Sequence, residues 1–575
     1  MKMLAVALPA ALWMFASTAG EAETKVTPGR FLIDPPTVEN LGFRWYIEGD
    51  SNRNASVIVE YRGKGAGAWK QAQPMLRIHN EVVNQAFQPY RTGNLFAGSI
   101  LFLEPATEYE ARFTMRDPDG GAPPPMTVTA ATRAEPPVHT GGRTILVKPG
   151  GLAEAYAAAQ PGDIFVLRGG IHKFTAPLEL TRSGEPGRPI VFRGAGDAEP
   201  ILEGPDHKTD LLRIGQASHL TFENLTFRRA RIALHGGEKG KPGSSHLTVR
   251  RCRIENVVYG IRTTSEESEG WLLTDNVITG INPQWFPRPT DGKYMEPAHT
   301  GVNVYGRGHV VRHNRISRFS DGIALANFGP PPAAPERQPA AIDIHNNDLS
   351  GAQDDAIETD YGAHNVRVYR NRLNNAHTGI SVQPFYGGPV YLVRNELYSI
   401  TTLTFKWHNY CAGILAYHNT LACSGSGFRS FDRWQNGHLR NNLILGGAGP
   451  AMTTGSISPY STLDYNGYRD NGAETLIRWF DGTREAFYKT LSEFSKATGH
   501  ERHGRMIDYD VFVHASAPLA GRSYEVGEWD LRLKPGAAAV DAGIELPNIN
   551  DGFRAKAPDL GFLELGERAP HYGPR

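Results

Sequence analysis

A repeated pattern of polar and hydrophobic positions runs through the middle of the chain. Asparagine is followed two positions later by isoleucine or leucine at Asn276, Asn314, Asn347, Asn371, Asn395, Asn419 and Asn442. The last five asparagines are 24, 24, 24 and 23 residues apart. A polar residue comes five positions after most of these apolar ones, often before glycine and another apolar residue, as in Asp321-Gly322-Ile323. Because each unit is too short to bury its own apolar face, stacked units must share one core. The pattern predicts a right-handed parallel β-helix, with the asparagines in an amide ladder at one turn.

The segment 25–135 has a different pattern. Apolar and polar residues alternate in Phe43–Ile47 and again in Ser56–Tyr61, which predicts short strands of a β-sandwich. The run Leu103-Glu104-Pro105-Ala106-Thr107-Glu108-Tyr109 resembles the Leu-x-Pro-x-Thr-x-Tyr run of fibronectin type III domains. This resemblance implies that Tyr109 lies at a strand corner with its hydroxyl bonded to backbone. It implies a spacer or platform, so we expect no chemistry in this domain.

The ends of the repeat have their own signals. A linker at Pro136-Pro137 and Gly141-Gly142 is followed by a predicted strand, a short helix over 152–159 and a second strand over 162–167. Such a helix can cover the open end of a β-helix, so we expect the β-helix over 140–470. The repeat fades after residue 470, and Ala473–Ala497 is predicted to be helical. We therefore expect 471–575 to be a helical insertion and a C-terminal cap.

Two coils are longer than the others. Asn282–His299 is rich in aromatic residues, among them Trp285, Phe286 and Tyr294, and Phe328–Pro339 is rich in proline. Loops that project from a repeat often build the walls of a binding groove, although a lid over the helix body would have the same pattern. The aromatic residues suit stacking on sugar rings or simply hold their loop together.

Composition narrows the setting of the protein. The apolar stretch Met3–Phe15 follows Lys2 and precedes small residues, which predicts an export signal over 1–22 and a secreted or periplasmic protein. No later segment approaches the ~20 apolar residues of a membrane span. Lys+Arg and Asp+Glu balance at 60 each, which argues against a nucleic-acid partner. Of the three cysteines, Cys252, Cys411 and Cys423, the last two either form a disulfide or remain small core residues. We expect a monomer.

Register in a β-helix converts sequence into geometry. Equivalent positions in successive coils lie above one another at the spacing of neighbouring strands, about 4.8 Å. One such column is predicted to point outward, because the residues before each of its members, such as Ile261 and Ile357, are apolar and point inward. This outer strip consists of Arg262, Asn303, Ala324, Glu358, Ser381, Lys406 and Arg429.

Carboxylates concentrate beside this strip. The run Asp354-Asp355-Ala356-Ile357-Glu358 holds three acids in five residues, with Asp360 just beyond it and Asp321 at the equivalent turn one coil earlier. Like charges this close repel unless a cation or protons offset them. Ca²⁺ binds six to eight oxygen ligands, and two neighbouring turns can supply such a cup. The alternative is a set of solvated turn aspartates.

These positions resemble those of the family nine polysaccharide lyases, which are calcium-dependent pectate lyases with a parallel β-helix. The resemblance implies that Asp321, Asp354, Asp355 and Glu358 bind Ca²⁺ and that Lys406 is the base. Glu358 departs from the family pattern, which has aspartate there. The implied reaction removes the C5 proton of a uronate by β-elimination, so the expected partner is an acidic polysaccharide. Arg429 is expected to act beside Lys406 by holding a substrate carboxylate.

Other residues and functions remain open at this point. Arg262, Asn303, Tyr361 and His408 are candidate substrate-binding residues, and Tyr361, His408 or water could protonate the leaving oxygen. His408 could equally be packed beside Trp407. A glycoside hydrolase of the polygalacturonase type would use Asp321, Asp354 and Asp355 as acid and base. A C5-epimerase or a carbohydrate-binding protein without catalysis would share the same fold.

Overall fold

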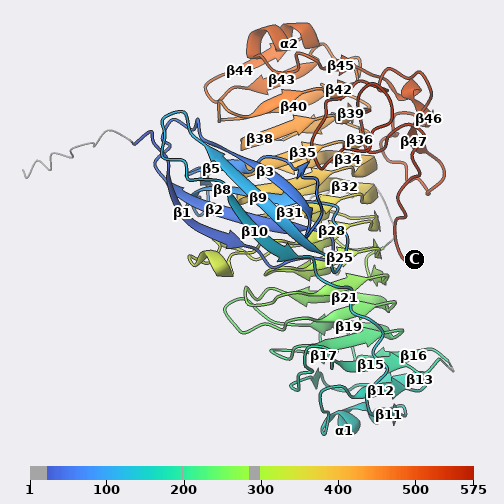
Figure 1. The fold of residues 1–575 in the computed structure, drawn as a ribbon. Helices are drawn as coiled ribbons and strands as arrows, with labels where there is room; N and C mark the ends of the chain where they lie inside the picture. The colour runs from blue at the N-terminus through green and yellow to red at the C-terminus, as the bar shows by residue number, and fades with distance from the viewer. Residues whose placement is uncertain (1–22, 197, 284–297, 431) are drawn as a thin grey trace, which may run out of the picture.

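The computed structural model describes residues 23–196, 198–283, 298–430 and 432–575. Its body is a right-handed parallel β-helix, stacked as a column of coils from α1 (Leu152–Tyr156) at one end to α2 (Leu491–Thr498) at the other (Figure 1). Among the described residues, one parallel sheet has 13 strands. These are β11 (Thr144–Val147), β12 (Ile164–Leu167), β15 (Ile190–Gly194), β18 (Leu220–Glu223), β20 (Thr248–Arg250), β22 (Leu272–Thr274), β25 (Val310–Arg312), β28 (Asp343–His345), β31 (Val366–Tyr369), β33 (Tyr386–Val393), β35 (Ala412–Tyr417), β38 (Gln435–Arg440) and β41 (Thr462–Asp464).

A second parallel sheet carries the candidate site. Within the described part of the chain it has 18 strands. They are β13 (Gly170–Lys173), β14 (Leu178–Glu179), β16 (Pro200–Glu203), β17 (Leu212–Arg213), β19 (Thr226–His235), β21 (Arg253–Thr263), β23 (Val277–Gly280), β24 (Thr300–Val304), β26 (Arg315–Ser317), β27 (Asp321–Ala324), β29 (Asp348–Ser350), β30 (Asp355–Glu358), β32 (Arg372–Val382), β34 (Glu396–Trp407), β36 (Thr420–Cys423), β39 (Leu443–Leu445), β42 (Gly467–Tyr468) and β45 (Arg505–Met506).

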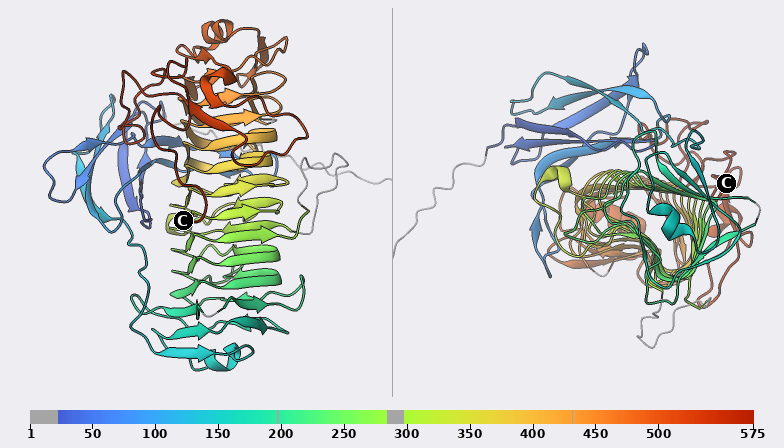
Figure 2. Two further views of the ribbon diagram at one scale, coloured as in Figure 1. Left: turned by 90° about the vertical axis from the view of Figure 1, so that its right-hand side faces the viewer. Right: turned by 90° about the horizontal axis from the view of Figure 1, so that it is seen from below.

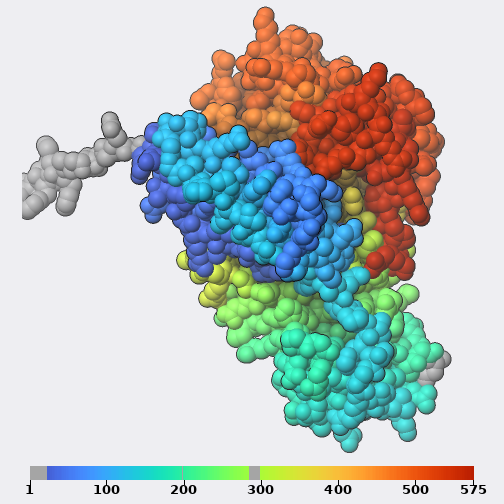
Figure 3. Space-filling model, viewed as in Figure 1, coloured from blue at the N-terminus to red at the C-terminus, as the bar shows by residue number. Residues whose placement is uncertain are grey.

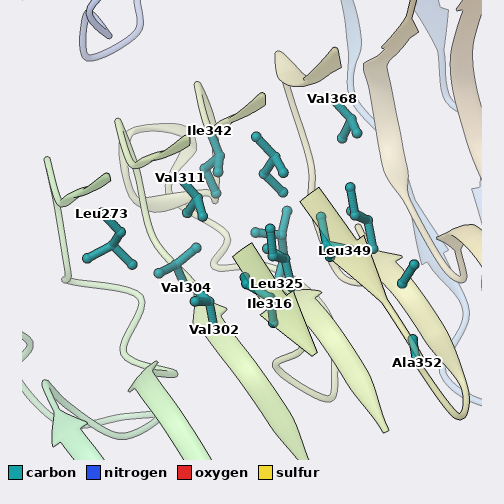
Figure 4. Packing of buried hydrophobic residues seen from close by; sticks show 14 of the residues in the cluster. Leu273, Val302, Val304, Val311, Ile316, Leu325, Ile342, Leu349, Ala352 and Val368 are labelled. Atoms are coloured by element: carbon teal, nitrogen blue, oxygen red, sulfur yellow. The ribbon is translucent and has the colours of Figure 1, made fainter. Parts of the chain in front are cut away.

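The core lies between the two sheets. Equivalent residues of different coils, such as Leu273, Val311 and Val368, are buried along the column, and Val302 and Ile316 of the second sheet share the same interior (Figure 4). Seen along the column, the coils superpose around this apolar interior (Figure 2). Each coil therefore buries its apolar face only against its neighbours, as the repeat pattern predicts.

The predicted asparagine ladder is confirmed. The side-chain amide of Asn371 donates a hydrogen bond to Asn395 Oδ1 at 3.0 Å, and the same contact joins each asparagine from Asn276 to Asn442 to the next. The ladder continues to Asn466, which the Asn-x-Ile/Leu pattern misses because Tyr468 stands at the apolar position. Its last amide donates to Glu501 Oε1 at 2.7 Å, so Glu501 terminates the ladder.

Glu501 should make stability depend on pH. Burial raises the pKa of Glu501 from 4.5 to about 7, although hydrogen bonds from Asn466 and Tyr468 act in the opposite direction. Since the folded state holds this proton more tightly than the unfolded state, its contribution to stability falls as pH rises from about 4.5 to 7 and then levels off. Glu501→Gln has no titrating group at this position and serves as the reference. The difference in free energy of unfolding, wild type minus Glu501→Gln, should fall by about 3 kcal/mol over this range. Urea unfolding at several pH values measures it, and a constant difference would contradict the assignment.

The predicted helix over Ala473–Ala497 is wrong for most of its length. Only α2 is helical, with a capping box between Thr490 and Glu493 and a left-handed C-cap at Gly499. The residues before it form the hairpin β43 (Ile477–Phe480) and β44 (Glu485–Tyr488), which extends a small sheet with β37 (Phe428–Arg429) and β40 (Met452–Gly455). The hairpin forms because Ile477 and Trp479, on either side of the exposed Arg478, bury their side chains in the end of the core.

The N-terminal domain is a β-sandwich of two antiparallel sheets. One consists of β1 (Thr27–Ile33), β2 (Leu41–Glu48), β8 (Asn94–Ile100) and β5 (Leu76–His79). The other consists of β10 (Met126–Ala131), β9 (Glu108–Arg116), β3 (Ser56–Gly63) and β4 (Lys70–Gln71). Tyr109 accepts a hydrogen bond from the Glu104 backbone N–H at 2.9 Å, as expected for a tyrosine corner. The fibronectin type III resemblance itself stays a prediction.

The sandwich packs against the 13-stranded sheet and covers the middle of the column (Figures 1 and 3). The contact is polar and buried: Asn365 donates to Asp34 at 2.8 Å, Asn40 donates to Asp343 at 2.7 Å, and the Ser99 N–H donates to Tyr391 Oη at 2.8 Å. Buried polar groups of this kind are costly to separate, because each would lose its partner. The sandwich is therefore fixed on the β-helix.

The C-terminal segment turns back along the column (Figure 2). After the short sheet of β46 (Phe512–His514) and β47 (Asp530–Leu533), the chain descends until Arg575 pairs with Asp275 at 2.8 Å. All three cysteines are free and buried, so Cys411 and Cys423 do not form a disulfide. Among the described residues, no helix is long and apolar enough to cross a membrane. The predicted export signal at 1–22 lies outside the described residues.

Candidate active site

Strand pairing gives the outer strip its observed register. Arg262 pairs with Asn303, Asn303 with Ala324, and Ala324 with Glu358. Glu358 pairs with Ser381, and Ser381 with Lys406. The predicted column is thus present from Arg262 to Lys406. Lys406 and Glu358 are separated by one intervening strand, β32, so a long side chain on one can reach the turn that precedes the other.

Five carboxylates converge beside this column. Oxygens of Asp321, Asp354 and Asp355 all lie within 4.8 Å of one another, and so do oxygens of Asp355, Glu358 and Asp360. Asp321 and Asp355 begin equivalent strands, β27 and β30, and the Asp355 N–H donates to Asp321 Oδ1 at 3.3 Å. Asp355 belongs to both groups, so it is the centre of the acidic cluster formed by these five residues.

Asp360 is part of the cluster, although its position in the sequence is only near the predicted ligands. It follows β30, and its Oδ1 accepts hydrogen bonds from Ser381 Oγ at 2.8 Å and from the Gln383 N–H at 2.6 Å. These contacts from the next coil hold its carboxylate toward Glu358 and Asp355. The spacing of two residues between Glu358 and Asp360 could have indicated this position. Alignment of the coils does not include Asp360, because it lies beyond the end of β30.

The cluster is electrostatically strained. Burial raises the pKa of Asp321 and of Glu358 well above their ordinary values, and the neighbouring carboxylates raise both further. Burial, with Asp355 adding to it, raises the pKa of Asp360 to about 8. Like charges in a poorly solvated site cannot all be ionised together without compensation. The cluster therefore requires protons or a cation.

Lys406 supplies one compensating charge. Its Nζ lies 2.5 Å from Asp355 Oδ2, and its side chain is only 14% exposed. Burial alone would lower the pKa of Lys406, but the carboxylates of Asp355, Asp360 and Asp354 together raise it. This direction is opposite to the lowered pKa that a neutral lysine base needs, since without a bound cation the acids dominate the environment of the lysine.

The donor set fits a hard divalent cation. Asp355 Oδ1 is buried and has no hydrogen-bond partner, while Oδ2 of the same carboxylate contacts Lys406. A buried oxygen without a partner is costly, and a carboxylate-rich cup with one free oxygen suits Ca²⁺. Of the residues predicted to bind metal, Asp321, Asp354 and Asp355 form one of the two groups, and Glu358 belongs with Asp360 in the other.

The structure distributes the predicted substrate-binding residues unevenly. Tyr361 follows Asp360 directly, and Asp360 and Glu358 add to the effect of burial in raising its pKa. His408 lies two residues past Lys406, and burial together with Lys406 lowers its pKa to about 4. Arg262 lies over the Tyr259 ring at 5.2 Å.

The remaining predicted residues lie farther along the strip. Asn303 donates to the Ala326 carbonyl at 3.4 Å, and Ala324 separates it from Glu358 in the column. Arg429 lies on β37 and pairs with Thr453 of β40, and burial and Arg478 lower its pKa. Trp285, Phe286 and Tyr294 of the first long loop lie outside the described residues.

Comparisons with known proteins give a likeness of fold. No protein-family model matches the chain, and no curated protein matches it. Pectate lyase Pel9A is similar over 75% of this chain and 98% of its own, with 13% identity and a TM-score of 0.34. A mannuronic acid-specific polysaccharide family 6 lyase from human gut microbiota is similar over 62% and 94%, with 14% identity and a TM-score of 0.37. The catalytic domain of a GH87 α-1,3-glucanase is similar over 76% and 82%, with 12% identity and a TM-score of 0.27.

Proposed function

We propose that the protein is a polysaccharide lyase that cleaves a uronic-acid-containing polysaccharide by calcium-assisted β-elimination, with Lys406 as the base. One observation carries the proposal: the Lys406 amine lies 2.5 Å from Asp355, whose second oxygen is buried without a partner in a cluster of five carboxylates. A base beside a cation site is the arrangement that proton removal next to a carboxylate needs. The predicted export signal would place this activity outside the cytoplasm.

In this proposal Asp321, Asp354, Asp355 and Glu358 hold the Ca²⁺, and Asp360 adds a fifth carboxylate. When bound, Ca²⁺ would neutralise the substrate carboxylate and stabilise the enolate charge that develops as the C5 proton leaves. Ser381 and the Gln383 N–H fix Asp360, so the cup is preorganised by the coil above it. The fit rests on the chemistry of the donor set, because oxygen ligands are the ones that Ca²⁺ prefers.

The residues of the outer strip and their neighbours have the other roles in the proposed reaction. Lys406 removes the C5 proton in its neutral form, and Arg429, one coil on, pairs with a substrate carboxylate. Arg262 and Asn303 bind sugar units farther along the strip. Tyr361 and His408 are the candidate donors of the proton that the leaving oxygen needs. Of these two, Tyr361 is next to the acidic cluster and keeps its proton, because its pKa is raised.

A glycoside hydrolase is the second candidate, because the raised pKa of Asp321 would suit a general acid. Its partner base would be Asp354 or Asp355. Inverting hydrolases separate the two carboxyl groups by roughly 6.5–9.5 Å to admit water. The oxygens here lie within 4.8 Å of one another, which favours a shared cation over an inverting pair. A C5-epimerase would use the same proton removal but leave the chain uncut.

Calcium dependence of near-ultraviolet absorbance tests the proposed function. The mature protein should generate absorbance on at least one of polygalacturonate and alginate, because elimination creates a conjugated C4–C5 double bond. The increase in absorbance should stop when a chelator is added and resume when excess Ca²⁺ is restored, because the proposed reaction needs the cation. New reducing ends without absorbance, unaffected by chelator, would instead support the hydrolase.

A further inference from the structure

An exposed aromatic ring stands beside the acidic cluster. Phe328 lies in the proline-rich loop between β27 and β28, and its side chain is 78% exposed. The ring packs on Tyr361, with centroids 5.2 Å apart, and Tyr361 is the residue after Asp360. Burying a phenyl ring that is now in water would contribute about 2 kcal/mol, so a ligand that packs on Phe328 would gain affinity there. A substrate ring would cover it.

The loop that carries Phe328 is anchored at its backbone. Lys239 Nζ donates to the Phe328 carbonyl, and Tyr386 Oη donates to the Gly329 carbonyl at 3.0 Å. Gly329 has a φ of +113°, a backbone conformation that residues other than glycine rarely adopt. The ring is therefore presented by a constrained backbone, which reduces the entropy lost when a ligand binds.

The N-terminal sandwich supports the same loop. Arg44 Nη1 donates to the Pro335 carbonyl at 2.9 Å. The Tyr90 ring packs on Tyr386 with centroids 5.0 Å apart. Tyr90 belongs to a hairpin of β6 (Val82–Val83) and β7 (Tyr90–Arg91). The sandwich, from which we expected no chemistry, thus buttresses the side of the site that carries Phe328.

The same hairpin also contacts the segment after Lys406. The Asn84 N–H donates to the Asn409 carbonyl at 2.7 Å, three residues after the proposed base. Gln435 Nε2, from the next coil of the 13-stranded sheet, donates to the Val82 carbonyl at 2.8 Å. A chain of four aromatic rings also connects the sandwich to the edge of the acidic cluster. In order, these are the rings of Tyr90, Tyr386, Tyr361 and Phe328.

We propose that Phe328 and Tyr361 form a stacking subsite for a pyranose ring of the acidic polysaccharide, next to the sugar held at the acidic cluster. This inference rests on the proposed function for its choice of substrate. A sugar ring has an apolar face of C–H groups that packs on an aromatic ring, while its hydroxyl and carboxylate groups stay at the rim. Phe328 offers such a surface without a charge, so it can bind an acidic sugar beside acidic residues that would otherwise repel it.

The test compares two exposed phenylalanines. Phe328→Ala should lower kcat/KM on the polymer about tenfold, with the loss carried by KM, because the ring contributes binding and not chemistry. In native gels that contain polygalacturonate or alginate, the variant should lose most of the retardation of the wild type. Phe487→Ala is the matched control, since Phe487 is 61% exposed on β44, in the small sheet that ends the column. It should behave as wild type in both measurements.

The outcomes separate this inference from the proposed function. If no polymer is cleaved by elimination but Phe328→Ala alone abolishes retardation, the subsite stands and the lyase proposal fails. If elimination occurs and Phe328→Ala matches Phe487→Ala in KM and in retardation, the stacking subsite is wrong while the lyase proposal stands. A wild-type protein that neither polymer retards would also overturn the subsite. Equal melting temperatures for the two variants verify that folding is unchanged.

Discussion

Lys406→Ala is expected to lower kcat for elimination on a polyuronate by about 10²–10⁴-fold, the range that a positioned general base contributes. The reason is geometric: Nζ of Lys406 lies at the edge of the acidic cluster, bonded to Asp355 Oδ2, where the carboxylate of a bound uronate would be neutralised. The initial rate of near-ultraviolet absorbance at saturating polymer measures the loss. Lys489→Ala, which removes a 70% exposed lysine far from the site, is the control and should keep the wild-type rate.

The same variant should not lose calcium. Removing the amine takes a positive charge away from Asp355 and leaves the carboxylates to the cation, so Ca²⁺ affinity should be unchanged or higher. Isothermal titration of Lys406→Ala with Ca²⁺ tests this directly. A variant that is inactive and also fails to bind Ca²⁺ would mean that Lys406 maintains the structure of the cluster, and its assignment as the base would lose its support.

Asp355→Asn should remove most of the stabilisation that Ca²⁺ gives the folded protein. A ligand that binds only the folded state adds about 2.7 kcal/mol at a free concentration of one hundred times Kd. Asp355 contributes to both oxygen groups of the cluster, so its loss weakens each of them. The measurement is the melting temperature with Ca²⁺ and with chelator. The wild type should melt about 2 °C higher with Ca²⁺, and Asp355→Asn should show little difference.

The control for this prediction is Asp470→Asn. Asp470 is an exposed turn aspartate whose Oδ1 accepts from the Gly472 N–H, a contact that asparagine can keep. Its calcium-dependent rise in melting temperature should equal that of the wild type. If Asp355→Asn keeps the full rise, Ca²⁺ binds elsewhere. If the wild type shows no rise at millimolar Ca²⁺, the acidic cluster is compensated by protons and Lys406 alone.

Sequence periodicity predicts the β-helix well, because the fold is a local rule applied repeatedly. Each asparagine of the ladder contacts an asparagine one coil away, and each apolar residue of the core packs on its equivalent in the next coil. The rule fails where the repeat ends. The hairpin around Ile477 and Glu485 joins the small sheet of β37 and β40, and no coil-to-coil spacing records that pairing. Helical propensity was therefore the wrong guide over 473–490.

The site was predictable to the extent that it follows the columns. Glu358, Ser381 and Lys406 are in register as the spacing indicates. Column alignment does not predict contacts that a long side chain makes with another coil, or contacts between segments that are distant in the sequence. Lys406 extends back to Asp355, and the carboxylates there raise its pKa. The support of Phe328 by Tyr90 is indirect, through Tyr386 and Tyr361. It joins residues more than two hundred positions apart across two domains, and no pattern within either domain indicates it.

The most direct test of the central claim is the mass of the products released in water labelled with oxygen-18. Elimination forms the new double bond without adding water, so oligosaccharides from a polyuronate cut in the presence of Ca²⁺ should contain no label in the newly formed ends. They should also be lighter by one water than saturated oligosaccharides of the same length. Saturated products that carry one labelled oxygen at each new reducing end would contradict the account and assign the acidic cluster to hydrolysis.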